Sequence, residues 1–237
     1  MQRAIIITGA SAGIGAATAV ALAQHGHLIL VARREDLLSA VARRVADAGG
    51  EATAIVADIT EANAPARIAA EADAIAERAD AEIEVLINNA GAFTTAQAAE
   101  ITAEHAEKLW KLNLLAPILL TTAVLPALRR HGRGTIINVS SVAAELAFAG
   151  CGVYSATKSG LEAWSRDLRE ELRRERIRVG VIAPGATATE AWPPGAVGDP
   201  GRVCRPEDIA AAVVAMVTAD VSASIDRLVI TPPLGPL

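Results

Sequence analysis

The chain has 237 residues, of which 52% are hydrophobic and 21% charged, with 22 lysines and arginines against 27 acidic residues. This composition excludes a disordered chain, and the net charge of −5 argues against a nucleic-acid partner, because a phosphate backbone favours a concentrated basic face. The length allows one large α/β domain or two small ones, and no linker-like stretch supports the second. We therefore predict one domain over residues 1–237.

The first predicted element is a short apolar run, Ala4–Thr8, directly after a basic N-terminus. A signal peptide begins in the same way, but this run is shorter than the ~7–15 apolar residues of such a leader and leads into glycines. We interpret it as a buried strand. Similar β-branched and apolar runs predict further strands at Leu28–Val31, Thr53–Val56, Val85–Asn88, Thr135–Ser140, Arg178–Ile182 and Leu228–Thr231.

Alanine-rich segments alternate with these strands. They predict helices at Ile14–His25, Asp36–Ala48, Ala64–Ala79, Ala103–Arg130, Tyr154–Glu175 and Pro206–Thr218, with a kink at Pro117. Strands that are apolar throughout are typical of a parallel sheet buried on both faces, and strand–helix alternation indicates right-handed βαβ units. The predicted fold class is α/β: a Rossmann fold with a doubly wound, seven-stranded parallel sheet flanked by helices.

The cysteines, histidines and apolar runs bear on metal binding and location. No apolar run reaches the ~20 residues that cross a bilayer, so no membrane partner is expected. Cys151 and Cys204 have neither a metal-ligand spacing nor a disulfide framework, and the four histidines are scattered, so no metal site is expected. We expect a reduced, cytoplasmic setting.

The stretch "TGASAGIG", Thr8–Gly15, follows the first predicted strand and opens the first helix. Gly9 can turn the chain sharply, while Gly13 and Gly15 let the helix N-terminus approach a pyrophosphate. Glycine loops also serve plain turns, but this position between strand and helix favours a dinucleotide site. The spacing is wider than the usual Gly-x-Gly-x-x-Gly.

The second strand leads into "VARRED", where dinucleotide folds that select NAD usually carry a carboxylate. Ala32 stands at that place and is followed by Arg33 and Arg34. A guanidinium holds a 2′-phosphate with two parallel charge-assisted bonds, whereas a carboxylate repels it. We predict NADP(H) as cofactor, with Arg33 as the main contact and Arg34 as a helper. The alternative is a solvated basic pair beside Glu35 and Asp36.

The stretch "YSATK" places a phenol, Tyr154, and an ammonium, Lys158, four residues apart in a predicted helix. Residues at i and i+4 share a helix face, so the two groups lie close together. A positive charge near a phenol favours the phenolate and lowers its pKa from ~10. A surface Tyr–Lys pair without a role is the alternative when the motif is taken in isolation.

Taken together, the glycine loop, "NNAG" (Asn88–Gly91), "VSS" (Val139–Ser141) and "YSATK" resemble the short-chain dehydrogenase/reductase family from Thr8 to about Ala219. The resemblance implies an active-site tetrad, which matches Asn113, Ser141, Tyr154 and Lys158. Ser141 is preferred to Ser140 because the family's usual serine–tyrosine separation fits it, and Ser140 would point to the opposite side of a strand.

The resemblance implies hydride transfer between the nicotinamide of NADP(H) and a small alcohol or carbonyl substrate. Tyr154 would be the acid/base, Ser141 would stabilise the substrate oxygen, Lys158 would lower the tyrosine pKa and bind ribose, and Asn113 would hold a water in a proton relay. A non-catalytic NADP-binding sensor or scaffold is the alternative function.

The resemblance also implies the other cofactor contacts. Asp58 would meet the adenine amino group, unless it serves as a helix N-cap or in a turn, and Thr189 would contact the carboxamide through its side chain. Asn88 would steady the central sheet. The full expected cofactor set is Gly9, Ser11, Gly13, Ile14, Gly15, Arg33, Arg34, Asp58, Ile59, Asn89, Ala90, Gly91, Tyr154, Lys158, Pro184, Gly185, Thr187 and Thr189.

The substrate is less well indicated. The segment after Thr189 is short and rich in proline and glycine, which predicts an open pocket. We expect apolar or mixed lining from Ala143, Leu146, Phe148, Cys151 and Trp192. The tail "DRLVITPPLGPL" resembles that of NADP-dependent serine 3-dehydrogenases and clavulanate-type dehydrogenases.

Assembly is also expected from the resemblance, since family members associate through two long helices, here Ala103–Arg130 and Tyr154–Glu175. A homodimer or homotetramer is expected. Leu161, Trp164, Leu168 and Leu172 recur at helical spacing in the second helix, and they could instead face the sheet.

Overall fold

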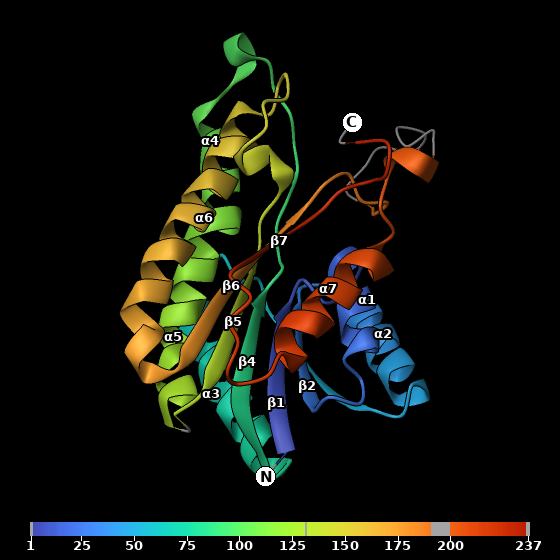
Figure 1. Ribbon diagram of the computed structural model, residues 1–237, viewed down its shortest axis with the longest axis vertical. Helices are drawn as coiled ribbons and strands as arrows, with labels where there is room; N and C mark the ends of the chain where they lie inside the picture. Colours follow the sequence, from blue (N-terminus) through green and yellow to red (C-terminus); the bar gives the residue numbers. More distant parts are fainter. Residues whose placement is uncertain (1, 131, 191–199, 236–237) are drawn as a thin grey trace.

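The structure is a computed structural model that describes residues 2–130, 132–190 and 200–235. Within these residues one parallel sheet runs through the molecule in the order β3-β2-β1-β4-β5-β6-β7 (Figure 1). The strands are β1 (Gln2–Thr8), β2 (His27–Ala32), β3 (Glu51–Val56), β4 (Ala81–Asn88), β5 (Gly134–Val139), β6 (Ile177–Pro184) and β7 (Arg227–Ile230). The predicted doubly wound sheet is confirmed, and the strand order reverses direction between β1 and β4.

Helices cover both faces of the sheet. On one face lie α1 (Gly13–Ala21), α2 (Glu35–Asp47) and α7 (Pro206–Thr218), and on the other lie α3 (Ala64–Arg78), α4 (Ala103–Trp110), α5 (Ala116–Arg130) and α6 (Gly152–Leu172) (Figure 1). A short 3₁₀ turn, η3 (Val142–Ala144), connects β5 toward α6. The predicted helices all exist, with ends that differ from the prediction by a few residues.

Two apolar clusters, one on each face, hold the layers together. One packs Ile6, Ile29 and Leu86 of the sheet against α3, α5 and α6, and the other packs Ile5 and Leu28 against α1, α2 and α7. Because side chains alternate across a strand, Ile5 and Ile6 enter opposite clusters. This arrangement leaves the carboxyl ends of the strands as the edge where loops from both layers meet.

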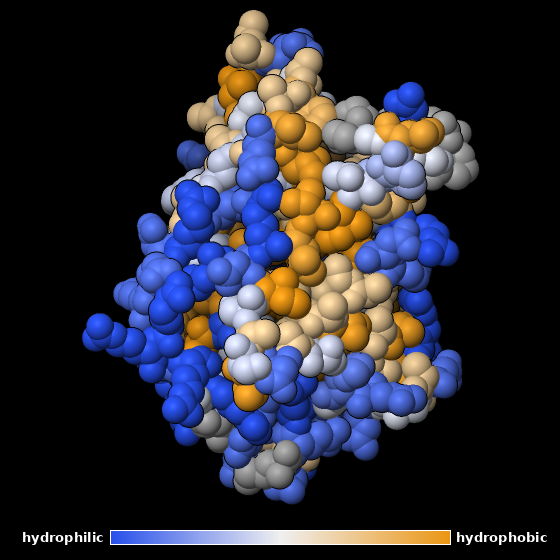
Figure 2. Space-filling view, in the orientation of Figure 1, coloured by the Kyte–Doolittle hydropathy of each residue, from blue (hydrophilic) through white to orange (hydrophobic). Residues whose placement is uncertain are grey.

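The two edge strands depart from the prediction that strands are buried on both faces. In β3 only Ile55 is buried, and β7 leaves Val229 50% exposed. Each has a partner strand on one side alone. Figure 2 shows apolar side chains gathered along the middle of the face on which β7 lies.

The helix predicted over Ala103–Arg130 contains a π-helical segment, η2 (Lys111–Leu115), between α4 and α5. Pro117 lies just after it. Proline has no N–H to donate to the carbonyl four residues earlier, which belongs to Asn113. The sequence predicts a kink at Pro117; the structure shows one π-helical turn that ends just before the proline, and the kink itself stays a prediction.

This same helical run, Ala103–Arg130, is long and apolar enough to cross a membrane by length and composition alone. The sequence from Leu112 to Leu128 contains no charged residue. The expectation of no membrane partner rests on apolar runs alone and does not consider this uncharged stretch. The structure gives another reason for its apolarity: Leu120, Val124 and Leu128 are buried against the sheet. A core helix of a globular fold passes the same test.

The apolar positions of α6 also face inward. Leu161, Leu168 and Leu172 are buried, and Trp164 packs against the α3–α5–α6 cluster. The alternative interpretation of this stripe, that it faces the sheet, is the one found. It therefore gives no support to assembly through α6.

Candidate active site

A cavity of about 780 Å³ opens at the carboxyl ends of the strands. The loops after β1, β2, β3, β4, β5 and β6 and the start of α6 all contribute to its wall. Every residue expected to bind the cofactor lines it except Gly15, and every tetrad residue lines it except Asn113. The sequence-predicted site residues are thus brought to one place.

The glycine loop turns as the sequence predicts. Gly9 has φ +66°, a left-handed conformation that favours glycine, and a Cβ there would lie 2.8 Å from the Cα of Ala90. Gly15 lies beneath the loop, where a Cβ would collide with the carbonyl oxygen of Gly9. The helix α1 begins at Gly13, so its unpaired N–H groups face the cavity.

The loop after β4 holds the glycine loop in place. Asn89 donates from Nδ2 to the carbonyl of Thr8 at 2.9 Å, and the Thr8 hydroxyl accepts from the N–H groups of Asn89 and Ala90 at 3.0 Å. Deeper in the sheet, Asn88 donates to Asn138 at 2.8 Å and to Thr121 at 2.9 Å. Asn88 therefore connects β4, β5 and α5, as expected from the resemblance.

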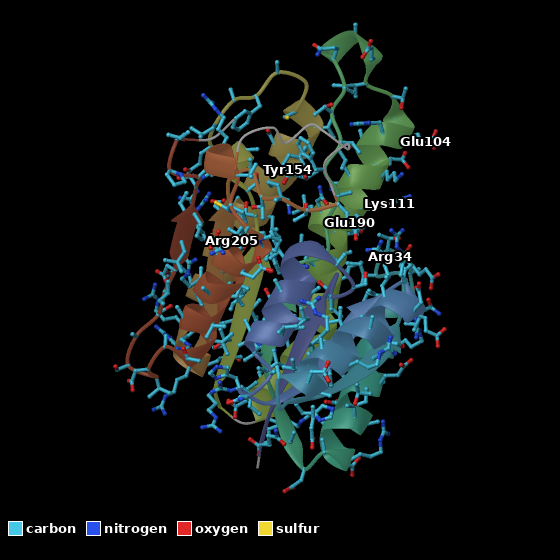
Figure 3. The ribbon with its side chains drawn as sticks, turned by 90° about the vertical axis from the view of Figure 1, so that its right-hand side faces the viewer. Arg34, Glu104, Lys111, Tyr154, Glu190 and Arg205 are labelled. Atoms are coloured by element: carbon cyan, nitrogen blue, oxygen red, sulfur yellow. The ribbon has the colours of Figure 1, made fainter. Side chains whose placement is uncertain are left out.

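Arg33 and Arg34 lie at one end of the cavity. Arg34 donates to the Ser11 hydroxyl at 3.3 Å and to the carboxylate of Glu190 at 3.0 Å (Figure 3). Arg33 is 72% exposed at its side chain and lies 3.6 Å from the carboxylate of Asp58. Glu190 was not identified from the sequence, because nothing local links it to an arginine 156 positions away.

Asp58 forms a turn. Its Oδ1 accepts from the N–H and the hydroxyl of Thr60 at 2.9 and 2.7 Å. Burial acts to raise the pKa of Asp58, but the Thr60 bonds and the charge of Arg33 outweigh it and hold the pKa below its ordinary value. Of the two alternative roles, Asp58 has the one in a turn. It is not the N-cap of α3, because that position is Asn63. Asp58 also lines the cavity.

The two adjacent serines point in different directions. Ser140 is buried, with its hydroxyl 3.5 Å from the carbonyl of Lys158. Ser141 accepts from the N–H of Ala143 at 3.1 Å, which starts η3, and its hydroxyl acts on the phenol of Tyr154 so as to lower the pKa of that phenol. The geometry agrees with the preference for Ser141.

Lys158 is buried one turn beyond Tyr154. Its Nζ donates to the carbonyl of Val139 at 2.8 Å and lies 5.9 Å from the centroid of the Tyr154 ring. Burial lowers the pKa of Lys158 from 10.5 to about 8, and the charge of Glu162 partly opposes that shift. The ammonium is retained at neutral pH with little margin.

The pKa of Tyr154 differs from the expectation. Burial raises it, the hydrogen bond with Ser141 acts to lower it, and Cys151 adds to the rise. The pKa of the phenol is therefore raised overall, contrary to the expectation that it falls below its ordinary value. The physical reason is that the cavity wall excludes water from the phenol, which disfavours the charged phenolate. Burial also disfavours the charged form of Lys158, because it lowers the pKa of that ammonium.

Phe93 also contacts the tyrosine. Its ring meets that of Tyr154 edge to face, with centroids 5.0 Å apart and an interplanar angle of 87°. It follows "NNAG" closely and lines the cavity. Phe93 was not identified from the sequence, although its place after that motif was an available signal.

Asn113 lies behind the cavity. Its side-chain amide pairs with the backbone of Ala92, accepting at 2.8 Å and donating at 2.9 Å, and it is 1% exposed. The side chain is thus used to hold the loop after β4. Its backbone carbonyl is the one that Pro117 leaves without the usual helical donor.

The loop after β6 lies across from the glycine loop. Thr187 is buried and donates to the carbonyl of Gly185 at 3.0 Å. The methyl group of Thr189 lies 3.1 Å from the position that a Cβ on Gly13 would take. Backbone bonds of Ala188 and Ala186 with Cys204, each 2.8 Å, hold this loop against the segment before α7.

Comparison with known proteins agrees with this geometry. The family model described as short chain dehydrogenase matches residues 3–195. The chain belongs to the short-chain dehydrogenase family.

Two solved structures and one protein sequence illustrate the likeness. An uncharacterized oxidoreductase of Methylorubrum extorquens is 36% identical over 229 residues, covering 91% of this chain and 90% of that protein. A metagenomic short-chain oxidoreductase in complex with NADP matches with a TM-score of 0.82 and 32% identity over 97% of this chain and 96% of its own. An alcohol dehydrogenase from Thermococcus sibiricus complexed with 5-hydroxy-NADP matches with a TM-score of 0.89 and 26% identity, covering 100% of this chain and 99% of its own.

The substrate side of this short-chain dehydrogenase is mostly apolar where the structure describes it. Ala143, Phe148 and Cys151 line the cavity as expected, and Phe93 and Leu112 join them. Leu146 does not line it and is 45% exposed, so that expectation is wrong; η3 and the turn after it carry the side chain outward. Trp192 lies outside the described residues.

Proposed function

We propose that this chain is an NADP(H)-dependent oxidoreductase that transfers a hydride between nicotinamide and a small alcohol or carbonyl compound. The observation that carries the proposal is the shared cavity: Tyr154, Ser141 and Lys158 line one end, and Arg33 and Arg34 line the other. Membership of the short-chain dehydrogenase family supports it.

The residues present fit a dinucleotide. Gly9 and Gly13 leave a cradle that side chains would fill, beside the N-terminus of α1, which suits a pyrophosphate. Arg34 and Ser11 offer donors for a 2′-phosphate, with Arg33 beside them. The NADP in the solved metagenomic relative supports this preference. When bound, the nicotinamide supplies or accepts the hydride.

Tyr154 exchanges the proton at the substrate oxygen. Its raised pKa keeps the phenol protonated at neutral pH, the form needed to reduce a carbonyl compound. Ser141 donates a second hydrogen bond to the same oxygen as negative charge develops on it. Lys158 supplies a positive charge that favours the phenolate left behind.

Asn113 supports proton return through its backbone. Pro117 cannot donate to the backbone carbonyl of Asn113, which we propose accepts from a water that connects bulk solvent to Lys158 and Tyr154. The side chain, paired with Ala92, fixes that carbonyl in place.

The substrate is a neutral, largely apolar carbonyl or alcohol. Phe93, Phe148 and Leu112 supply apolar surface, and Lys158 is the charged side chain on that side of the cavity in the described residues. The narrower resemblance to serine and clavulanate-type dehydrogenases, the cytoplasmic location, and assembly as a homodimer or homotetramer all stay predictions.

A panel of aldehydes and ketones with NADPH and NADH tests the proposal, together with a fluorescence titration of each cofactor. We expect turnover with several apolar ketones and a higher kcat/KM with NADPH. Tight NADPH binding without turnover on the whole panel would favour a cofactor sensor. A preference for NADH would overturn the role of Arg33 and Arg34.

A further inference from the structure

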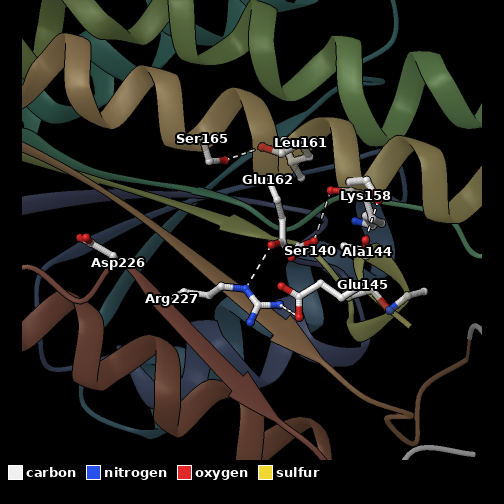
Figure 4. A network of polar contacts seen from close by, with 12 residues as sticks. Ser140, Ala144, Glu145, Lys158, Leu161, Glu162, Ser165, Asp226 and Arg227 are labelled. Carbon is white, nitrogen blue, oxygen red and sulfur yellow. Dashed lines mark hydrogen bonds and ion pairs between the residues drawn. The ribbon is translucent and has the colours of Figure 1, made fainter. Parts of the chain in front are cut away.

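A buried carboxylate, Glu162, pairs with a partly buried arginine, Arg227, beyond Lys158 along α6. The side chain of Glu162 projects from α6 one turn after Lys158, on the same side of the helix, and the residue is 6% exposed (Figure 4). Arg227, at the start of β7, donates from Nε to Oε2 of Glu162 at 3.1 Å. Neither residue has a part in the mechanism proposed above.

The pair is incompletely bonded. Oε1 of Glu162 is buried without a hydrogen-bond partner in the described residues, and so is Nη2 of Arg227, which lies 3.1 Å from Glu145 but outside hydrogen-bond geometry. A buried unsatisfied polar atom costs ~1–3 kcal/mol, and buried ion pairs often contribute no net stability. Stabilisation of the β7–α6 contact alone therefore explains this pair poorly.

Lys158 gives a reason for a negative charge at this position. Its ammonium is buried against a neutral carbonyl, that of Val139. Among the described residues, Tyr154 and Cys151 line the cavity with Lys158, and Glu162, one turn further along α6, is the charged group that acts on it. The phenol and the thiol are neutral at pH 7, because burial raises the pKa of each, which leaves Glu162 as the anion.

Arg227 has the opposite influence. It pairs with the carboxylate of Glu162, whose charge also acts on Lys158, and its Nη2 lies 3.1 Å from the more exposed carboxylate of Glu145 (Figure 4). The cations Lys158 and Arg227 thus flank a single buried carboxylate. The electrostatic stabilisation of the Lys158 ammonium by Glu162 therefore depends on how strongly Arg227 neutralises that carboxylate.

We propose that Glu162 is a positioning residue of the active site, whose buried carboxylate, held by Arg227, keeps Lys158 in its ammonium form. Glu162 acts on Tyr154 only through Lys158. The consequence for catalysis rests on the proposed function, but the charge of Lys158 is a property of the protein alone.

Lysine side-chain NMR tests this directly. Lys108 and Lys111, both exposed on or next to α4, are the other lysines of the chain, so a lysine-labelled sample gives a simple spectrum. Lys158→Met assigns the remaining signal. In the unmodified chain we expect its titration midpoint near 8. In Glu162→Gln we expect it about one pH unit lower or more, with Glu162→Asp in between.

Two further variants separate electrostatics from packing. Arg227→Gln removes the competing cation, so the midpoint of Lys158 should rise. Glu145→Gln removes a charge of the same sign as Glu162 that is 61% exposed and therefore screened by solvent, so it should move the midpoint less than Glu162→Gln does. If Glu162→Gln does not fold with Arg227 unpaired, the double variant Glu162→Gln/Arg227→Gln is compared with Arg227→Gln. An unchanged midpoint on loss of Glu162, or a change of the same sign in the Glu162 and Arg227 variants, would overturn the proposal.

Turnover then distinguishes this inference from the proposed function. In Glu162→Gln, kcat with NADPH should fall about tenfold for each pH unit by which the Lys158 midpoint drops below the assay pH, and it should recover as the pH is lowered, because Lys158 is then protonated again. A purely structural defect would not recover in that direction, and that outcome would also overturn the proposal. If the unmodified chain reduces no carbonyl compound while the NMR midpoints move as expected, the proposed function fails and the role of Glu162 stands.

Discussion

Arg34 and Glu190 form an ion pair across the cavity mouth, with Nη1 3.0 Å from Oε2 (Figure 3). One residue follows β2 and the other follows β6, so the pair connects opposite walls of the cavity. Arg34 is also a donor proposed for the 2′-phosphate. The carboxylate of Glu190 and that phosphate are therefore competitors for one guanidinium.

Removing this competitor should strengthen NADPH binding. Both partners are about half exposed or more, and exposed ion pairs are worth ~0.2–1 kcal/mol. We expect Glu190→Gln to lower the Kd of NADPH by up to about fivefold, measured by cofactor fluorescence. NADH, which lacks the 2′-phosphate, is the control, and its Kd should not change. An equal gain for both cofactors would contradict competition for Arg34.

The arginines should determine which cofactor is used. Charge-assisted hydrogen bonds contribute ~1.5–3 kcal/mol, so loss of both guanidinium groups in Arg33→Ala/Arg34→Ala should raise KM for NADPH by roughly 10–100-fold. KM for NADH should change little. Single variants decide which arginine dominates: the sequence favours Arg33, whereas the contact with Ser11 belongs to Arg34. Loss of NADH binding in the double variant would indicate damage to the β2 loop instead.

The features that could be predicted from the sequence are those that a local sequence pattern determines. Apolar runs located all seven strands, and the position of Gly9 between β1 and α1 located the pyrophosphate loop. The family motifs then placed Ser141, Tyr154 and Lys158 together, since their spacing reflects a shared scaffold.

Contacts between distant segments were not predictable in this way. Glu190 reaches Arg34, and Arg227 reaches Glu162, only because the fold brings β6 and β7 beside them. The raised pKa of Tyr154 depends on burial by the whole cavity wall, Phe93 included, which the spacing of "YSATK" does not contain. The π-helical turn at Lys111–Leu115 depends on backbone bonding around Pro117.

The pKa of Tyr154 can be followed directly, since it is the only tyrosine in the chain. Tyrosinate absorbance in the ultraviolet should give a midpoint above the ordinary 10.0, because burial disfavours the charged phenolate. The hydrogen bond with Ser141 opposes that rise, so Ser141→Ala should move the midpoint still higher. Cys151→Ser serves as the control from the same wall and should lower it. A midpoint that falls in Ser141→Ala would contradict the assigned hydrogen bond.

The burial of Lys158 should lower the free energy of unfolding of the protein. Its pKa falls from 10.5 in the unfolded chain to about 8 in the folded one. Between these values the unfolded state binds more protons, so stability rises with pH across this window, and below pH 8 the full cost applies. That cost is on the order of 3 kcal/mol. Lys158→Met should therefore unfold at higher denaturant concentration than the unmodified chain at pH 7 while turnover is abolished.

The same comparison at high pH is its internal control. Well above pH 10.5 both states of the unmodified chain hold a neutral Lys158, so the stability difference from Lys158→Met should shrink toward zero. The measurement is urea denaturation at a series of pH values, with equal m-values showing that the transition itself is unchanged. A variant that is less stable at pH 7, or a difference independent of pH, would show that the bond to Val139 outweighs the burial of the ammonium. Agreement would mean that the chain gives up folding free energy to keep a cation beside Tyr154.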